Sequence, residues 1–173
     1  LLPSSKENGY IVLVLGAHHN TKMLTEEKIL SILSNIEYPV ILLGGQADYQ
    51  FGESIQKKHP TNVFNACGKF SINQSASIIQ QSKVVVSPDT GMMHVAAALR
   101  KPLISIWGNT IPEFGMYPYY SHSLSAIFEV KGLPCRPCSK LGYKKCPKKH
   151  FRCIEDLNSN EIVSKIDEFW KQI

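Results

Sequence analysis

The most constraining feature of this sequence is a regular alternation of short apolar runs with segments of helical periodicity. Each apolar run is nearly continuous, and a glycine or a polar turn follows it. Strands that are apolar on both faces are typical of a parallel sheet that helices cover on both sides. The pattern therefore predicts an α/β, Rossmann-like three-layer sandwich with a mostly parallel six-stranded sheet. We expect strands over 12–15, 39–43, 62–65, 84–86, 103–107 and 125–130, and helices over 24–36, 49–59, 71–81, 158–173 and within 87–102.

Length and charge limit the classes of function. The 173 residues suit one domain with a sizeable core. The formal net charge of +5 favours anionic ligands such as nucleotides, but it is too small to indicate nucleic acid by itself. No run is long and apolar enough to cross a bilayer, and residues 1–10 lack the pattern of a signal peptide. We therefore expect a cytoplasmic protein and, because the chain does not begin with Met, a piece of something longer.

Glycine and polar residues gather immediately after the predicted strands. In a parallel sheet these turns meet at the carboxyl edge, where ligands bind, and glycine lets the backbone approach a ligand closely. Glycines that merely end strands are the plain alternative, but five such turns in succession favour a ligand site. The turns are 16–22, 44–48, 67–69, 87–91 and 108–110.

The turn after the fourth predicted strand carries most of the chemistry. In SPDTGMMHVAAALRKP, residues 87–102, an acid and a hydroxyl stand where a helix would begin. Asp89 or Thr90 would cap this helix, and Gly91 would leave its first amides uncovered, which suits a diphosphate. Thr90 and His94 are four apart and share a helix face. The alternative is that Asp89 is only a helix cap and His94 a satisfied, half-buried histidine.

This segment resembles the signature of glycosyltransferase family 9, the lipopolysaccharide heptosyltransferases. In SPDTGMMHVAAALRKPLISIWG the acid, hydroxyl, glycine, histidine, alanines, proline and final glycine keep the family's register, and GAHHNTK, ILLGGQAD and CGKFSINQSASIIQQSKVVVSPD resemble its other strand-end turns. The resemblance runs from about Tyr10 to the C-terminus. It implies the C-terminal half of a GT-B fold, so that 1–173 is a single nucleotide-sugar-binding domain and the N-terminal acceptor domain is absent.

The resemblance also implies roles for individual residues. The lysine would neutralise the donor diphosphate, and the threonine before it would assist. An acid after the second strand would accept hydrogen bonds from the ribose, and the signature acid would contact the sugar. The helix entry would cradle the phosphates through its threonine, glycine and two methionine amides, with the histidine in support. In this order the residues are Lys22, Thr21, Asp48, Asp89, Thr90, Gly91, Met92, Met93 and His94.

The activity that the resemblance implies is inverting transfer of a sugar, most simply heptose from ADP-heptose, to a lipopolysaccharide core acceptor. The base would lie in the absent domain, so this chain would bind donor without turnover, and the lipid-linked acceptor implies a peripheral contact at the inner membrane. The leaving diphosphate would need no metal, because a lysine and oriented amides can stabilise it. Another nucleotide sugar is an alternative, as is a non-catalytic zinc-binding interaction module. One departure is Met23-Leu24-Thr25, where the family commonly has an aromatic residue and a proline.

The segment 132–153, which we term the Cys/Lys loop, contains CRPCSKLGYKKCPKKHFRC. Its cysteines, the four-thiol cluster, could hold one structural zinc. Disulfides and reduced thiols that pack the loop are the alternatives, and we favour a structural role over a catalytic one. Its lysines could form a nucleic-acid patch, a lipid contact or a solvated loop; we favour the solvated loop and expect no nucleic-acid partner. The four cysteines are Cys135, Cys138, Cys146 and Cys153.

Overall fold

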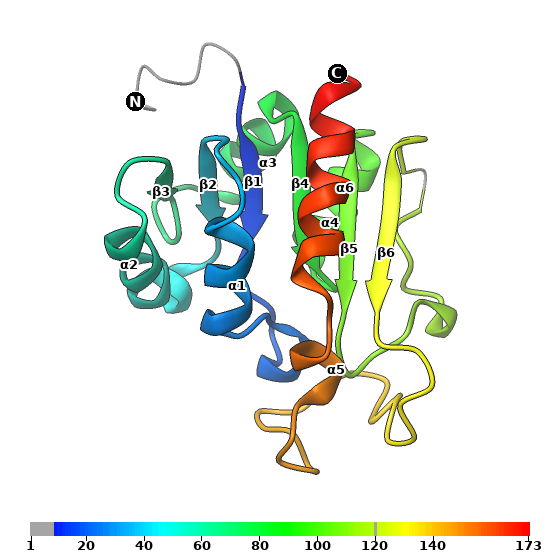
Figure 1. The fold of residues 1–173 in the computed structure, drawn as a ribbon. Helices are drawn as coiled ribbons and strands as arrows, with labels where there is room; N and C mark the ends of the chain where they lie inside the picture. Colours follow the sequence, from blue (N-terminus) through cyan, green and yellow to red (C-terminus); the bar gives the residue numbers. More distant parts are fainter. Residues whose placement is uncertain (1–8, 120) are drawn as a thin grey trace.

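A computed structural model describes residues 9–119 and 121–173, and shows strands alternating with helices from its first element onward (Figure 1). The N-terminal segment in which we looked for a signal peptide lies, up to residue 8, outside the described residues. The strands are β1 (Ile11–Val14), β2 (Val40–Leu43), β3 (Val63–Asn65), β4 (Val84–Pro88), β5 (Leu103–Trp107) and β6 (Ser125–Glu129). The α-helices are α1 (Glu26–Leu33), α2 (Tyr49–Lys58), α3 (Ile72–Gln81), α4 (Gly91–Ala98), α5 (Arg152–Glu155) and α6 (Ser159–Lys171).

The six strands form one sheet in the order β3-β2-β1-β4-β5-β6. All five neighbouring pairs are parallel, which confirms the predicted sheet. The chain moves outward from β1 to β3 and then returns to place β4 on the other side of β1. The turns after β1 and β4 therefore lead to opposite faces of the sheet and leave a crevice between them, the usual ligand position in such sheets.

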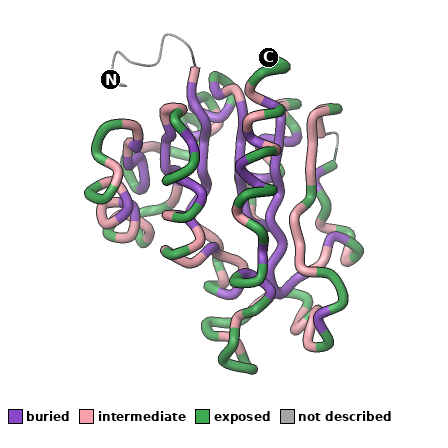
Figure 2. Tube along the Cα trace, in the orientation of Figure 1, coloured by how far each residue is buried: buried purple, intermediate pink, exposed green. Residues whose placement is uncertain are grey.

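The strands bury both faces, which explains their continuous apolar character. In β1, Ile11 and Leu13 contact one core, whereas Val12 and Val14 contact the other. Helices α1 and α6 cover the first face and α3 and α4 the second (Figure 1). Figure 2 shows the central strands as buried and the edge strand β6 as largely intermediate. The three predicted layers are therefore present.

The helices begin where the sequence placed their caps. The Thr25 hydroxyl accepts a hydrogen bond from the Lys28 amide at 3.3 Å, and Ser71 caps α3 through a capping box. Helix α1 is shorter than the predicted 24–36 at both ends: it starts after the Thr25 cap, which Leu24 precedes, and it ends at Leu33. Three short 3₁₀ helices, η2 (Asn20–Lys22), η3 (Gln46–Asp48) and η4 (Pro112–Phe114), and the single-turn α5 were not predicted. Within the described residues, no helix has the length and apolar character that a membrane crossing needs.

Candidate functional site

The predicted ligand turns meet at the carboxyl edge of the sheet, at the lower end of Figure 1. A cleft of about 410 Å³ opens there between the turns that follow β1, β2 and β4. Gly16, Asp48, Thr90 and Met92 are among the residues that line it. We call it the donor cleft. It lies at the position where the strand order reverses, between β1 and β4.

The centre of the site is a chain of three side chains from three different turns. Lys22 Nζ lies 2.6 Å from Asp89 Oδ2, and the Thr110 hydroxyl donates to the same oxygen at 2.9 Å. The ion pair is largely shielded, because the side chains are 12% and 4% exposed. Asp89 Oδ1 makes no hydrogen bond to any described residue, so it remains available as an acceptor. Asp89 is therefore not merely a helix cap.

The N-terminus of α4 lies beside this ion pair. Thr90 is the N-cap residue, but its side chain makes no capping hydrogen bond. Gly91 is exposed, and a Cβ built there would meet no atom within 4 Å. The first amides of a helix have no partner within it, so this end can receive an anion. The structure thus brings a lysine and a helix N-terminus together across the crevice.

Two other residues of α4 lie differently from the roles that the resemblance implied. The Met93 amide already donates to the Thr90 carbonyl at 3.1 Å, and its side chain is fully buried in the core. Met92, by contrast, lines the donor cleft. His94 is exposed rather than half-buried, and it is not among the residues that line the described cleft.

Asp48 closes the side of the donor cleft next to β2. Its Oδ2 accepts a hydrogen bond from the Gly45 amide at 2.8 Å. The carboxylate also packs directly over Gly16, where an added Cβ would lie 2.1 Å from Oδ2. A side chain at position 16 would displace the acid, so this glycine is required by a close approach. Asp48 lines the cleft from this fixed position.

Thr21 connects the site to the Cys/Lys loop. Its hydroxyl accepts from the Tyr143 amide at 2.7 Å and donates to the Tyr143 carbonyl at 3.1 Å. Thr21 is buried, and its carbonyl packs against Gly108. The threonine that was expected to assist in diphosphate binding thus holds the backbone of η2 in place. Thr21 therefore positions the neighbouring Lys22.

Comparison with known proteins bears on this geometry. The model of the family described as glycosyltransferase family 9 (heptosyltransferase) matches residues 2–149. This chain belongs to glycosyltransferase family 9. Among curated members, lipooligosaccharide heptosyltransferase 2 of Haemophilus influenzae is 34% identical over 91 residues, which are 50% of this chain and 26% of the relative. Lipopolysaccharide heptosyltransferase 2 of Salmonella typhimurium is 33% identical over 104 residues, 58% of this chain and 29% of the relative.

Solved structures of family 9 share the fold. E. coli ADP-heptose lps heptosyltransferase II superposes with a TM-score of 0.77 at 23% identity, over 99% of this chain and 48% of that one. The E. coli heptosyltransferase WaaC with ADP gives 0.69 at 20% identity, over 98% and 46%. The chain thus spans about half the length of these structures, and a smaller share of the curated relatives.

The four-thiol cluster lies beside the site. Among the described residues, no group of three or more His, Cys, Asp or Glu side chains is placed to hold a metal. Cys135 Sγ is 3.7 Å from His150 Nε2, and the Cys138 thiol donates to the Cys135 carbonyl at 3.0 Å. Burial raises the pKa of the Cys153 thiol to about 12. All the described cysteines are free of disulfides. Zinc stays a prediction.

The sequence reasoning did not assign two residues that organise this family 9 site. Thr110 belongs to a turn that was expected to face the ligand, and it meets Asp89 because the structure pairs β5 with β4, an adjacency that was not predicted. The Arg136 side chain is only 6% exposed; it donates to the carbonyls of Gly108 and Thr110 at 2.6 and 2.8 Å, and pairs with Glu129. It fixes the turn that holds Thr110. No sequence signal distinguished it within the Cys-x-x-Cys pair.

Proposed function

We propose that this chain is the donor-binding half of an inverting glycosyltransferase that transfers heptose from ADP-heptose to a lipopolysaccharide core acceptor. Family membership and the names of the curated relatives support the reaction class. The observation that carries the donor role is the ion pair of Lys22 with Asp89 next to the N-terminus of α4. Thr90 and Met92 of that helix end line the donor cleft, whereas Lys22 and Asp89 are not among its lining residues.

The proposed chemistry follows from the charges that sugar transfer creates. The bond between the anomeric carbon and the diphosphate oxygen breaks, and its electron pair stays on the diphosphate. The acceptor hydroxyl oxygen bonds to the anomeric carbon, and its proton passes to a base that we place outside this chain. Lys22 and the free amides of Thr90 to Met92 would stabilise the leaving diphosphate, because fixed donors in a shielded site act most strongly where charge develops. This arrangement supplies the role that a metal would otherwise have.

Asp89 would have two functions in this reaction. Its Oδ2 holds Lys22 beside the helix end, and Thr110 holds that oxygen from the opposite side. Its unpaired Oδ1 would accept a hydrogen bond from a hydroxyl of the sugar. Asp48 would accept hydrogen bonds from the ribose at the other end of the cleft. The donor would therefore lie across the carboxyl ends of β1, β2 and β4.

A nucleotide panel tests the donor assignment. Saturation at about one hundred times Kd stabilises a protein by about 2.7 kcal/mol, which raises Tm of a chain of this size by roughly 5–10 °C. We expect ADP to produce this shift at concentrations where UDP and GDP produce little. A larger shift with UDP or GDP would indicate a family 9 relative that uses another nucleotide sugar. No shift with any of the three would contradict the donor role.

The acceptor side of the proposal concerns the complete protein. A lipid-linked saccharide would bind mainly to the N-terminal half, and such a substrate would bring the enzyme to the cytoplasmic surface of the inner membrane. Joining this chain to its N-terminal half and assaying release of ADP from ADP-heptose would test the complete reaction, and this chain alone is expected to bind donor without turnover.

A further inference from the structure

A second pocket lies at the same edge of the sheet, outside the donor cleft. It has a volume of about 370 Å³, and the turn after β1 and the Cys/Lys loop line it. Its charged lining residues are Lys144, Lys145 and Lys149, with no carboxylate among them, and Asn20 and Phe151 are also present. We call it the lysine pocket. Its charge favours an anionic ligand.

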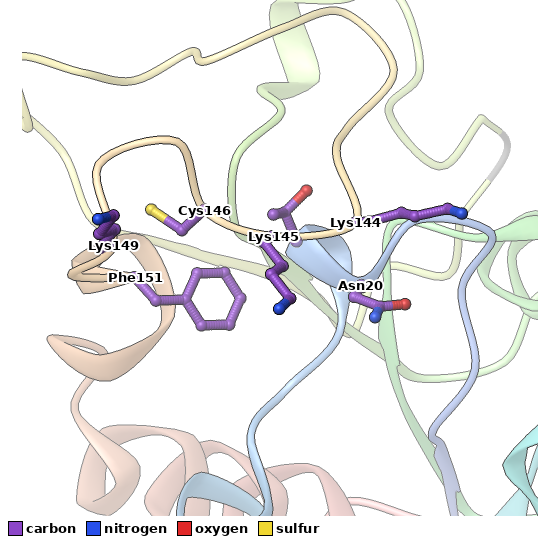
Figure 3. Close-up of a pocket in the computed structure, with 7 residues that line it drawn as sticks. Asn20, Lys144, Lys145, Cys146, Lys149 and Phe151 are labelled. Carbon is purple, nitrogen blue, oxygen red and sulfur yellow. The ribbon is translucent and has the colours of Figure 1, made fainter.

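The three lysines have no partner in the part of the chain that the structure describes. None of them forms an ion pair or a side-chain hydrogen bond with any described residue, whereas Lys22, Lys58 and Lys165 all do. Figure 3 shows the Phe151 ring directed towards Lys145, with Asn20 and Lys144 beyond it and Lys149 on the opposite side. In this view Lys145 lies beside the Phe151 ring, whereas the Lys144 side chain extends away from it, and no described residue neutralises any of the three charges.

The backbone around the lysine pocket is strained. Only three non-glycine residues among those described have positive φ, and two of them, Lys149 at 62° and Phe151 at 47°, line this pocket. Each such residue costs about 1–3 kcal/mol, and residues of this kind concentrate at ligand sites. The strain is maintained by neighbouring contacts: the Lys149 amide donates to the Cys146 carbonyl, and the Arg152 amide to His150 Nδ1.

A third cavity of about 610 Å³ lies between the lysine pocket and the donor cleft and shares lining residues with both. That cavity shares Asn20 and Phe151 with the lysine pocket, and His18 and Asp48 with the donor cleft. The third cavity borders the end of the donor cleft at which we place the ribose. The lysine pocket adjoins the reacting end through its lining residue Thr21, which directly precedes Lys22. The donor diphosphate already has Lys22 and α4 as counter-charges, so the lysine pocket remains for a different anion.

We propose that the lysine pocket is a subsite for a phosphate or carboxylate group on the saccharide acceptor. This inference rests on the proposed function, because it requires a sugar acceptor, and it departs from the sequence-based view of the lysines as a merely solvated loop. The pocket would hold the charged group while the acceptor hydroxyl approaches the donor cleft.

The test is an NMR titration of the chain with glucose 6-phosphate, with glucose as the neutral control, in the absence and presence of saturating ADP. We expect glucose 6-phosphate to shift the amides of Lys145, Lys149 and Phe151, glucose to shift none of them, and ADP to leave these shifts unchanged. ADP itself should shift Gly91 and its neighbours. That second set of signals reports the donor role independently, so failure of the subsite and failure of the proposed function are distinguishable.

Two triple variants of equal net charge separate the effect of the pocket lysines from the effect of overall charge. The triple variant K144Q/K145Q/K149Q removes the three pocket charges, whereas K131Q/K140Q/K148Q removes three exposed charges from the same region that do not line the pocket. Both lower the formal net charge of +5 by three. We expect the first to weaken glucose 6-phosphate binding by roughly tenfold and the second to leave it within about twofold.

Four outcomes would overturn the proposal. Equal loss in the two triple variants would mean attraction by general charge alone. Displacement of glucose 6-phosphate by ADP would assign the pocket to the donor. Absence of any shift in the three pocket amides would mean that no anion binds there. Tighter binding of a single-stranded oligonucleotide, with a steep dependence on salt, would assign these lysines to nucleic acid.

Discussion

Replacement of Gly91 by alanine separates ligand binding from folding at the N-terminus of α4. A Cβ at this position meets no described atom within 4 Å, so the substitution fits the unliganded fold. The Cα–Cβ bond of a helical residue tilts towards the helix N-terminus, which is where a diphosphate would bind. The added methyl group would therefore occupy ligand space while leaving the protein contacts intact.

Thermal stability and ADP affinity should change in opposite directions in this variant. Alanine is favoured over glycine by at most about 1 kcal/mol in a helix, so Tm should stay equal or rise by roughly 2–4 °C. A hydrogen bond from an amide to a charged phosphate contributes about 1.5–3 kcal/mol. Loss of one such bond would weaken ADP binding by roughly 10- to 150-fold.

Calorimetric titration with ADP and thermal unfolding of the same preparations measure both effects. Ala98→Gly serves as the control, because Ala98 is the exposed last residue of the same helix. It should lower Tm slightly without changing ADP affinity. If Gly91→Ala binds ADP with unchanged affinity, the helix end does not hold the diphosphate and our reasoning about the donor cleft is wrong.

Three further predictions concern the fold around the site. Asp89→Asn leaves Lys22 shielded and without its charged partner, which should cost about 3–5 kcal/mol in the free energy of unfolding. Urea unfolding of Asp89→Asn, Lys22→Met and the double variant should show that the double change costs less than the sum of the two single changes. Gly52→Ala should destabilise by about 1–3 kcal/mol although alanine favours helices, because the new Cβ would lie 2.2 Å from Asn65 Oδ1; a more stable variant would contradict this packing. The zinc prediction is decided by elemental analysis of chain purified under reducing conditions, where about one zinc per chain would support it and a metal-free chain with reactive thiols would refute it.

The predicted fold was correct because its signals are local. Continuous apolar runs such as Val84–Val86 indicate buried parallel strands, and the hydroxyls of Thr25 and Ser71 mark helix starts that the structure confirms. The sequence predicted a mostly parallel sheet but not the order of its strands, since that order depends on which apolar runs pair. The ends of helices shifted by a few residues, because apolar periodicity continues past a cap, as at Leu24.

The sequence predicted where the site lies, but not which of its side chains form hydrogen bonds with one another. The turns after the strands identified Asp89 and the start of α4, because parallel topology brings carboxyl ends together, and the family resemblance singled out Lys22 within the first of these turns. The partner of each polar atom depends on side-chain directions that no spacing encodes. The sequence therefore could not show that Thr21 binds Tyr143 rather than a ligand, or that Thr110 shares an oxygen of Asp89 with Lys22.

These contacts link the Cys/Lys loop to the donor cleft. Thr21 is bonded to Tyr143 of the loop on one side and is followed directly by Lys22 on the other. Arg136 of the same loop fixes the Gly108–Thr110 turn, whose threonine holds Asp89. Both members of the central ion pair are therefore positioned by one loop through separate routes. Since that loop also forms the lysine pocket, an anion bound there would act on the segments that orient Lys22 and Asp89, and the two substrates of the proposed reaction would meet through a shared structural element.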